Sequence, residues 1–180
     1  MAKLMTLPRL PRPARGAAIA FVLALVAAAP VAAAQPTRTV NHNLHSYVLP
    51  AGLACAFAVK YEPSGGFGTE TDFSDGTVVY TVRKRGQYVN LETGASFVTV
   101  DTFREIDEFD DATNILFGVD YGEVTGWFYP GDTGPFGPVG SNGALYHFAG
   151  TATYTVDFNL NLNTGVTYTG TVTDVCAELS

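Results

Sequence analysis

The most constraining feature of this 180-residue chain is a strict alternation of apolar and polar side chains in its last third. From residue 151 to residue 160 every second residue is apolar, and those between are Thr, Asp or Asn. Successive side chains of a β-strand point to opposite faces, so this pattern predicts a strand with one buried face. Asn163-Thr164-Gly165 predicts a turn, and the threonines that follow predict a return strand over 166–176.

Earlier parts of the chain have the same β character. Short runs rich in Val, Ile, Thr, Tyr and Phe are separated by Gly, Asp and Asn. The predicted strands are 53–61, 77–82, 88–91, 96–109, 115–121 and 123–129. The first of them is apolar enough to be central, whereas the Gly-rich segment 63–68 and the Gly- and Pro-rich segment 130–143 predict loops.

About eight strands with hairpin-length connections, and no helical pattern among them, predict an all-β fold. An antiparallel β-barrel and a two-sheet β-sandwich share this pattern, so both alternatives stay open. Residues 51–180 are expected to form a single domain. Residues 35–50 are polar and contain prolines, which predicts an extended or flexible lead-in or an edge strand.

Residues 1–34 have the three parts of a secretory signal peptide. A basic segment with Lys3 and three arginines precedes the apolar run 17–29, and Val31-Ala32-Ala33-Ala34 offers a cleavage site. Thirteen apolar residues are too few to span a bilayer comfortably, so we expect a cleaved signal-peptide helix rather than an anchor. The mature protein is expected to be secreted and to have no stable membrane span.

Only two cysteines occur, Cys55 and Cys176. In an exported chain a single pair predicts one disulfide bond. The bridge would join the first core strand to the last and close a loop of about 120 residues. In the chain-entropy model, closing a loop of this length stabilises the folded state by roughly 4–5 kcal/mol.

The charge balance disfavours nucleic acid as a partner. The chain has 10 Lys and Arg against 17 Asp and Glu, and cleavage after Ala34 would remove four basic residues, leaving 6 − 17 = −11. Such a field repels phosphate backbones. The one basic cluster, Arg83-Lys84-Arg85 beside Gly86, is interpreted as a solvated hairpin tip.

Three short segments carry a resemblance to a known group. They are Cys55-Ala56-Phe57, Asn90-Leu91-Glu92-Thr93-Gly94 and Asp174-Val175-Cys176-Ala177-Glu178-Leu179. With them the chain resembles, over roughly residues 50–180, uncharacterised secreted β-rich proteins common in actinobacteria. The resemblance implies the β domain and the bridge, and it implies no activity.

The densest acidic stretch, 105–114, suggests a calcium site. Calcium prefers several oxygen ligands, and Asp107, Asp110, Asp111 and Asn114 are the candidate ligands. The spacing is not that of an EF-hand, so a solvated connection between strands is the favoured alternative. No cofactor is expected.

A group of aromatic residues is the candidate ligand site. Trp127 and Tyr129 lead into the loop that contains Phe136, and aromatic side chains on a β scaffold can stack on a ligand. Core packing is the favoured alternative for these residues.

No nucleophile motif or metal-binding spacing supports catalysis. His42, His45 and His147 lack a partner pattern, and no pair of acids stands out for glycoside hydrolysis. We expect a secreted, non-catalytic protein that binds a small ligand or a cell-envelope component. A lipocalin-like carrier of an apolar ligand and a small carboxylate-dependent hydrolase are the alternatives.

Overall fold

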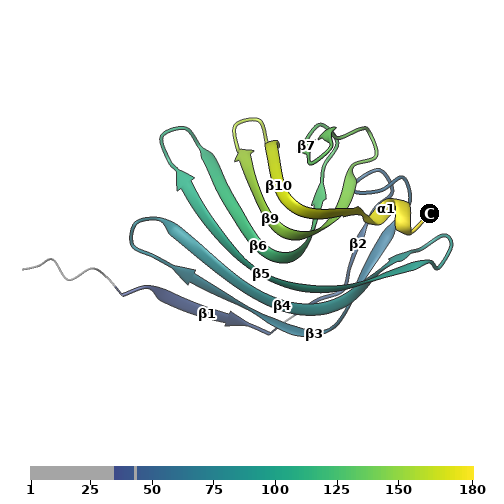
Figure 1. Ribbon diagram of the computed structural model, residues 1–180, viewed down its shortest axis with the longest axis horizontal. Helices are drawn as coiled ribbons and strands as arrows, with labels where there is room; N and C mark the ends of the chain where they lie inside the picture. The colour runs from purple at the N-terminus through teal and green to yellow at the C-terminus, as the bar shows by residue number, and fades with distance from the viewer. Residues whose placement is uncertain (1–34, 43) are drawn as a thin grey trace, which may run out of the picture. The chain divides into compact units, whose positions relative to one another are not determined.

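The computed structural model describes residues 35–42 and 44–180, so the predicted signal peptide lies outside the described residues. The described chain consists mainly of antiparallel strands and ends in one helical turn (Figure 1). The strands are β1 (Thr37–Asn41), β2 (Tyr47–Leu49), β3 (Val59–Asp72), β4 (Thr77–Asn90), β5 (Ser96–Asp110), β6 (Ile115–Phe128), β7 (Thr133–Gly134), β8 (Gly137–Pro138), β9 (Ala144–Asp157) and β10 (Leu162–Asp174). The helical turn is α1 (Val175–Glu178). The prediction of an all-β fold is confirmed.

One eight-stranded sheet forms most of the domain. Its order is β1-β3-β4-β5-β6-β9-β10, with β2 also paired to β3, and β7 and β8 form a separate two-stranded sheet. Within the described residues β1 and β10 are the two ends of this order, so the sheet does not close into a barrel. The predicted number of strands and their antiparallel pairing are confirmed, and the closed-barrel alternative is excluded.

The long strands bend along their length (Figure 1). Gly122, Gly150 and Gly170 lie directly opposite one another on β6, β9 and β10. Their φ angles are 119°, 142° and 116°, a region that side chains disfavour. A Cβ on any of the three would collide with a carbonyl oxygen of the neighbouring strand. This row of glycines therefore lets three strands bend at the same level.

Two predicted turns are wrong because they lie within these long strands. Gly122 is the middle of β6 rather than a hairpin between two short strands. Arg83-Lys84-Arg85 lies inside β4 and pairs with β3 and β5 on either side. In both cases a glycine marks a bend or a close approach, not the end of a strand.

Three predicted boundaries are also wrong. The segment 63–68 belongs to β3, where a β-bulge between Pro63 and Gly65 absorbs the irregular backbone. The last hairpin turns between β9 and β10 at residues 158–161, and Asn163 to Gly165 is a bulge in β10. The predicted strand at 53–61 begins only at Val59, so Cys55 lies in a buried turn.

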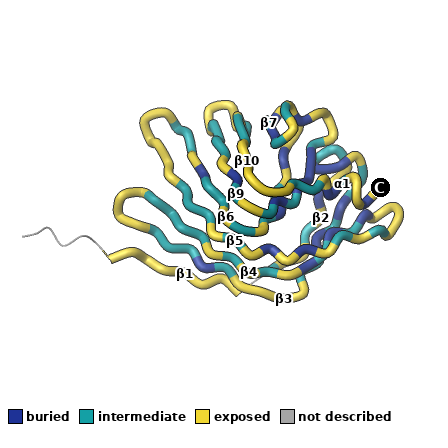
Figure 2. Tube along the Cα trace, in the orientation of Figure 1, coloured by how far each residue is buried: buried dark blue, intermediate teal, exposed yellow. Residues whose placement is uncertain are grey.

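The disulfide bond between Cys55 and Cys176 is confirmed, with the two Cα atoms 5.6 Å apart. It links the turn before β3 to α1, and not two strands as predicted, because β10 ends at Asp174. Val175 and Leu179 are fully buried beside it. Figure 2 shows buried residues in dark blue around β2 and α1. A hydrophobic core cluster lies there, and its buried members include Leu49, Cys55, Val59, Val175 and Leu179.

Cross-strand pairing defines two faces of the sheet. Tyr61 lies opposite Tyr88, and Lys84 lies opposite Asp101, so these four residues share one face. We call this the inner face, because its side chains meet the core and the buried polar groups. The alternate residues along each strand, such as Arg83 and Arg85 on either side of Lys84, lie on the outer face.

Candidate functional site

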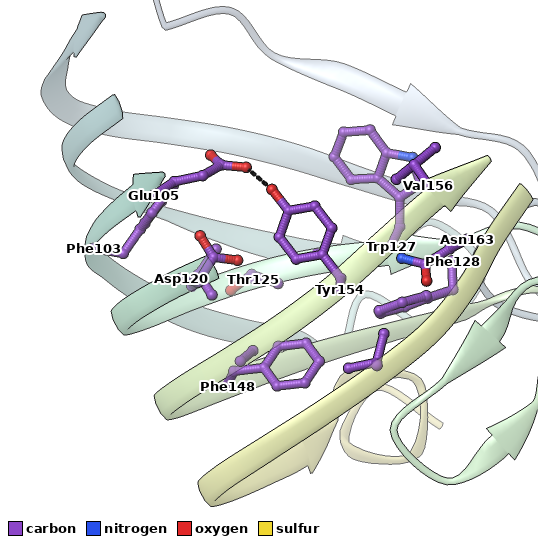
Figure 3. A pocket seen from close by; sticks show the side chains of 14 residues that line it. Phe103, Glu105, Asp120, Thr125, Trp127, Phe128, Phe148, Tyr154, Val156 and Asn163 are labelled. Carbon is purple, nitrogen blue, oxygen red and sulfur yellow. Dashed lines mark hydrogen bonds between the residues drawn. The ribbon is translucent and has the colours of Figure 1, made fainter. Parts of the chain in front are cut away.

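A pocket of about 290 Å³ opens over β5, β6, β9 and β10 (Figure 3). Most of its walls are apolar. The lining residues are Phe103, Glu105, Asp120, Val124, Thr125, Gly126, Trp127, Phe128, Phe148, Ala152, Tyr154, Val156, Asn163 and Val166. A concave apolar site with a few polar groups is the usual form of a small-molecule site in proteins.

Glu105, Asp120 and Tyr154 place two carboxyl groups and a phenol in the lining of this pocket, and Asp107 adjoins them through Tyr154. Tyr154 Oη donates to Glu105 Oε1 and lies 2.9 Å from Asp107 Oδ1. Asp120 lies opposite Glu105 in the register of β5 and β6. Gly118, opposite Tyr154, leaves the space for the phenol ring, because a Cβ there would overlap it. We call Glu105, Asp107, Asp120 and Tyr154 the acidic cluster.

The acidic cluster has too few protons if every carboxyl is ionised. The Tyr154 hydroxyl has one proton but lies within hydrogen-bonding distance of two carboxyl groups. A proton on Glu105 or Asp107 would satisfy the second contact. Burial raises the pKa of both groups, and the hydrogen bond from Tyr154 opposes that rise. The geometry therefore favours a proton on one of the two carboxyl groups that contact Tyr154.

Asp120 has the largest shift among the three acids. Its pKa is raised to about 8, first because burial disfavours the charged form and then because Glu105 and Asp107 repel it. Its Oδ1 atom is buried and has no hydrogen-bond partner among the described residues. An acid of this kind at the edge of an apolar pocket is a typical feature of a functional site.

We expect the free energy of unfolding to fall as the pH rises from about 4 to about 8. An unfolded Asp releases its proton near pH 4, whereas folded Asp120 keeps it until about pH 8. Between these values the folded state holds more protons, so stability declines with rising pH. Asp120→Asn should flatten this decline in urea unfolding measured from pH 4 to 9.

Asp110→Asn is the matched control for this experiment. Its carboxyl lies in an exposed turn, where hydrogen bonds from Thr113 and Ala112 lower its pKa. Its stabilising effect is therefore lost only as the pH falls below about 4. An equal flattening by both substitutions would contradict the role of Asp120.

A second group of polar residues lies deeper on the inner face. Asp101 is fully buried, with Oδ2 3.1 Å from Lys84 Nζ and Oδ1 accepting a 2.8 Å hydrogen bond from Thr125 Oγ1. Thr125 Oγ1 is also 2.9 Å from His147 Nδ1. Since the single hydroxyl proton goes to Asp101, His147 carries a proton on Nδ1 and donates it to Thr125.

This buried network corrects the interpretation of Lys84 and accounts for His147. Lys84 faces inward to Asp101, with its ammonium group 5.6 Å from the centre of the Tyr61 ring, and is not at a hairpin tip. His147 packs edge-on against Phe97. Thr125 belongs both to the network and to the pocket lining, so the network supports one wall of the pocket.

The structure separates the three candidate aromatic residues. Trp127 lines the pocket and packs against Tyr47 of β2, with the ring centroids 5.7 Å apart. Tyr129 and Phe136 do not line it. Phe136 packs instead against Tyr146, since the segment 130–143 folds back as the β7–β8 hairpin.

The four candidate calcium ligands lie in two places. Asp107 belongs to the acidic cluster, whereas Asp110, Asp111 and Asn114 lie at the turn between β5 and β6. Asp110 accepts hydrogen bonds from Ala112 N and Thr113 Oγ1, and Asn114 Nδ2 donates to Asn159. Across residues 35–42 and 44–180, no group of three or more His, Cys, Asp or Glu side chains is placed to hold a metal ion.

The sequence reasoning did not select Glu105, Asp120 or Tyr154 as site residues. Glu105 stands in an acidic stretch, but only the register of β5 against β6 brings it beside Asp120. One feature of the sequence could have indicated them. Glu105 and Asp107 are separated from Asp101 by an even number of positions, so on a strand all three point to the same face, and Asp101 is buried. Acidic residues on the core side of a strand need a local explanation.

Comparison of the chain with protein-family models, with curated proteins and with solved structures finds no match. In the part of the chain that the structure describes, no helix is long and apolar enough to cross a membrane. The site must therefore be interpreted from its own chemistry.

Proposed function

We propose that this protein is an extracellular, non-catalytic binding protein that holds a small amphiphilic ligand in the inner-face pocket. The observation that carries this proposal is the combination, in one cavity, of apolar walls with Glu105, Asp120 and Tyr154 of the acidic cluster. Apolar walls supply affinity, and a few fixed polar groups supply orientation. Because the polar end is acidic, it suits a ligand head that donates hydrogen bonds, such as an amine.

The extracellular location is supported by the signal-like segment 1–34 and by the disulfide bond. Disulfide bonds persist in oxidising compartments and are rare in the cytosol. The resemblance to secreted actinobacterial proteins agrees with the same location. The proposed function is similar to that of a lipocalin-like carrier. Here, however, the ligand would bind on an open curved sheet and not inside a closed barrel.

A fluorescent probe tests the pocket directly. We expect the neutral dye N-phenyl-1-naphthylamine to gain fluorescence with this protein. Ala152→Leu should weaken binding by about tenfold or more, because Ala152 is buried in the pocket lining and a larger side chain fills it. Ala149→Leu, also on β9, is the control, since Ala149 does not line the pocket. Equal loss in both variants, or no dye binding by the parent, would refute the proposal.

A carboxylate-dependent hydrolase is the second candidate, favoured by one observation. Glu105 and Asp107 meet at the Tyr154 hydroxyl, and paired acids are what glycoside hydrolysis requires. Binding remains the better proposal because the adjoining walls are apolar. Hydrolysis of aryl glycosides that disappears in Glu105→Gln and in Asp107→Asn would reverse this preference.

A further inference from the structure

Charged residues are divided between the two faces of β3, β4 and β5. The register places Glu70, Asp72, Asp101, Glu105 and Asp107 on the inner face. Three arginines, Arg83, Arg85 and Arg104, lie together on the outer face of β4 and β5. Although the whole chain has a net charge of −7, this part of its surface is basic. We call these three residues the arginine patch.

The arginine patch is not neutralised within the domain. All three side chains are exposed, and none makes an ion pair with the described residues. Of the outer-face acids at its border, Glu62 is already bound by Lys60 and Gln87, and Glu123 lies opposite Thr102. Arginine stays charged at every physiological pH, so the patch keeps its charge for an external partner.

A hollow adjoins two of these arginines. It has a volume of about 290 Å³, and its lining residues include Gly65, Gly66, Arg83 and Arg85. Gly65 lies opposite Arg85 and has no side chain to cover it. A phosphate group in this hollow would meet two guanidinium groups, whose fork geometry matches phosphate oxygens.

Exposed apolar side chains lie among the same residues. Val98 and Val100 of β5 are 69% and 40% exposed, and Phe67 of β3 is 38% exposed. Val100 lies opposite Arg85, and Phe67 lies opposite Arg83. Arginine beside exposed aliphatic and aromatic groups is typical of surfaces that meet the boundary between lipid headgroups and acyl chains.

We propose that the outer face of β3, β4 and β5 docks on an anionic phospholipid surface. The arginine patch contacts the phosphates, and Phe67, Val98 and Val100 contact the lipid below them. The acidic inner face lies on the other side of the sheet, where salt screens its repulsion from the membrane. This inference concerns a different face from the pocket and does not depend on the proposed ligand.

Vesicle sedimentation tests this proposal. The protein is used in the processed form that is purified from its host. We expect binding to vesicles of phosphatidylcholine with 30 mol% phosphatidylglycerol, and little binding to phosphatidylcholine alone. Arg83→Gln with Arg85→Gln should weaken binding by about tenfold or more, and 0.5 M salt should have a similar effect. Thr169→Glu with Thr171→Glu on the exposed edge strand β10 is the control, because it changes the net charge equally.

Three results would overturn the proposal. One is equal binding to neutral and anionic vesicles, and another is equal loss in the arginine and threonine variants. The third is an arginine-dependent interaction with inorganic phosphate that occurs without any preference for vesicles. Arg83→Lys with Arg85→Lys keeps the charge and should retain most of the binding, which separates a charge effect from a folding defect.

Discussion

Replacing Cys55 and Cys176 together by alanine is expected to lower the free energy of unfolding by about 4 kcal/mol. The bridge spans 121 residues, and closing a loop of this length restricts the unfolded chain strongly. It also fastens α1 to the turn before β3, where Val175 and Leu179 complete the core. Urea unfolding of the double variant against the oxidised parent measures the effect.

The reduced parent protein is the control for this prediction. It lacks the bridge but keeps both sulfur atoms, so it separates the loss of the crosslink from the loss of packing around buried Cys55. Reduced parent and double variant should unfold at similar urea concentrations. A double variant as stable as the oxidised parent would show that the bridge has no stabilising role.

Gly150→Ala is expected to destabilise the domain by about 2–4 kcal/mol. Gly150 has a φ of 142°, and a Cβ there would collide with the Thr169 carbonyl oxygen on β10. Either the backbone of β9 must leave this conformation or the two strands must separate. Thermal unfolding followed by circular dichroism measures the change.

Gly126→Ala in β6 is the matched control. A Cβ at this position would have no atom within 4 Å, and its φ is not in the positive range. Alanine should therefore be tolerated there, and the lower entropy of the unfolded chain favours it. If the two variants lose the same stability, the glycine row does not determine the bend.

Much of the fold could be predicted because it depends on local pattern. The alternation around Tyr154 and the Val- and Thr-rich run 77–82 both predicted strands that the structure contains. The errors occurred at glycines inside strands. Gly86 and Gly122 look like turn residues in sequence, but one makes room for the Tyr61 ring and the other bends β6. That difference depends on neighbouring strands, which a single sequence does not show.

The candidate site was less predictable for the same reason. Trp127 was selected as an aromatic residue near a loop, and it does line the pocket. The acidic cluster depends instead on the register of three strands, which brings Glu105, Asp120 and Tyr154 together from distant parts of the chain. The raised pKa of Asp120 and the need for a proton beside Tyr154 arise only when folding brings these residues together.

The most direct test of the proposed function uses the single tryptophan of the chain. Trp127 lines the pocket, so its fluorescence reports occupancy without a label. Titration with dodecylamine at pH 9, where Asp120 is ionised, should change its emission in a saturable way. Dodecanoate should bind at least about tenfold more weakly at this pH because the acidic cluster repels a carboxylate. Asp120→Asn should reduce this preference. An unchanged emission with dodecylamine, or tighter binding of dodecanoate, would contradict the proposed site.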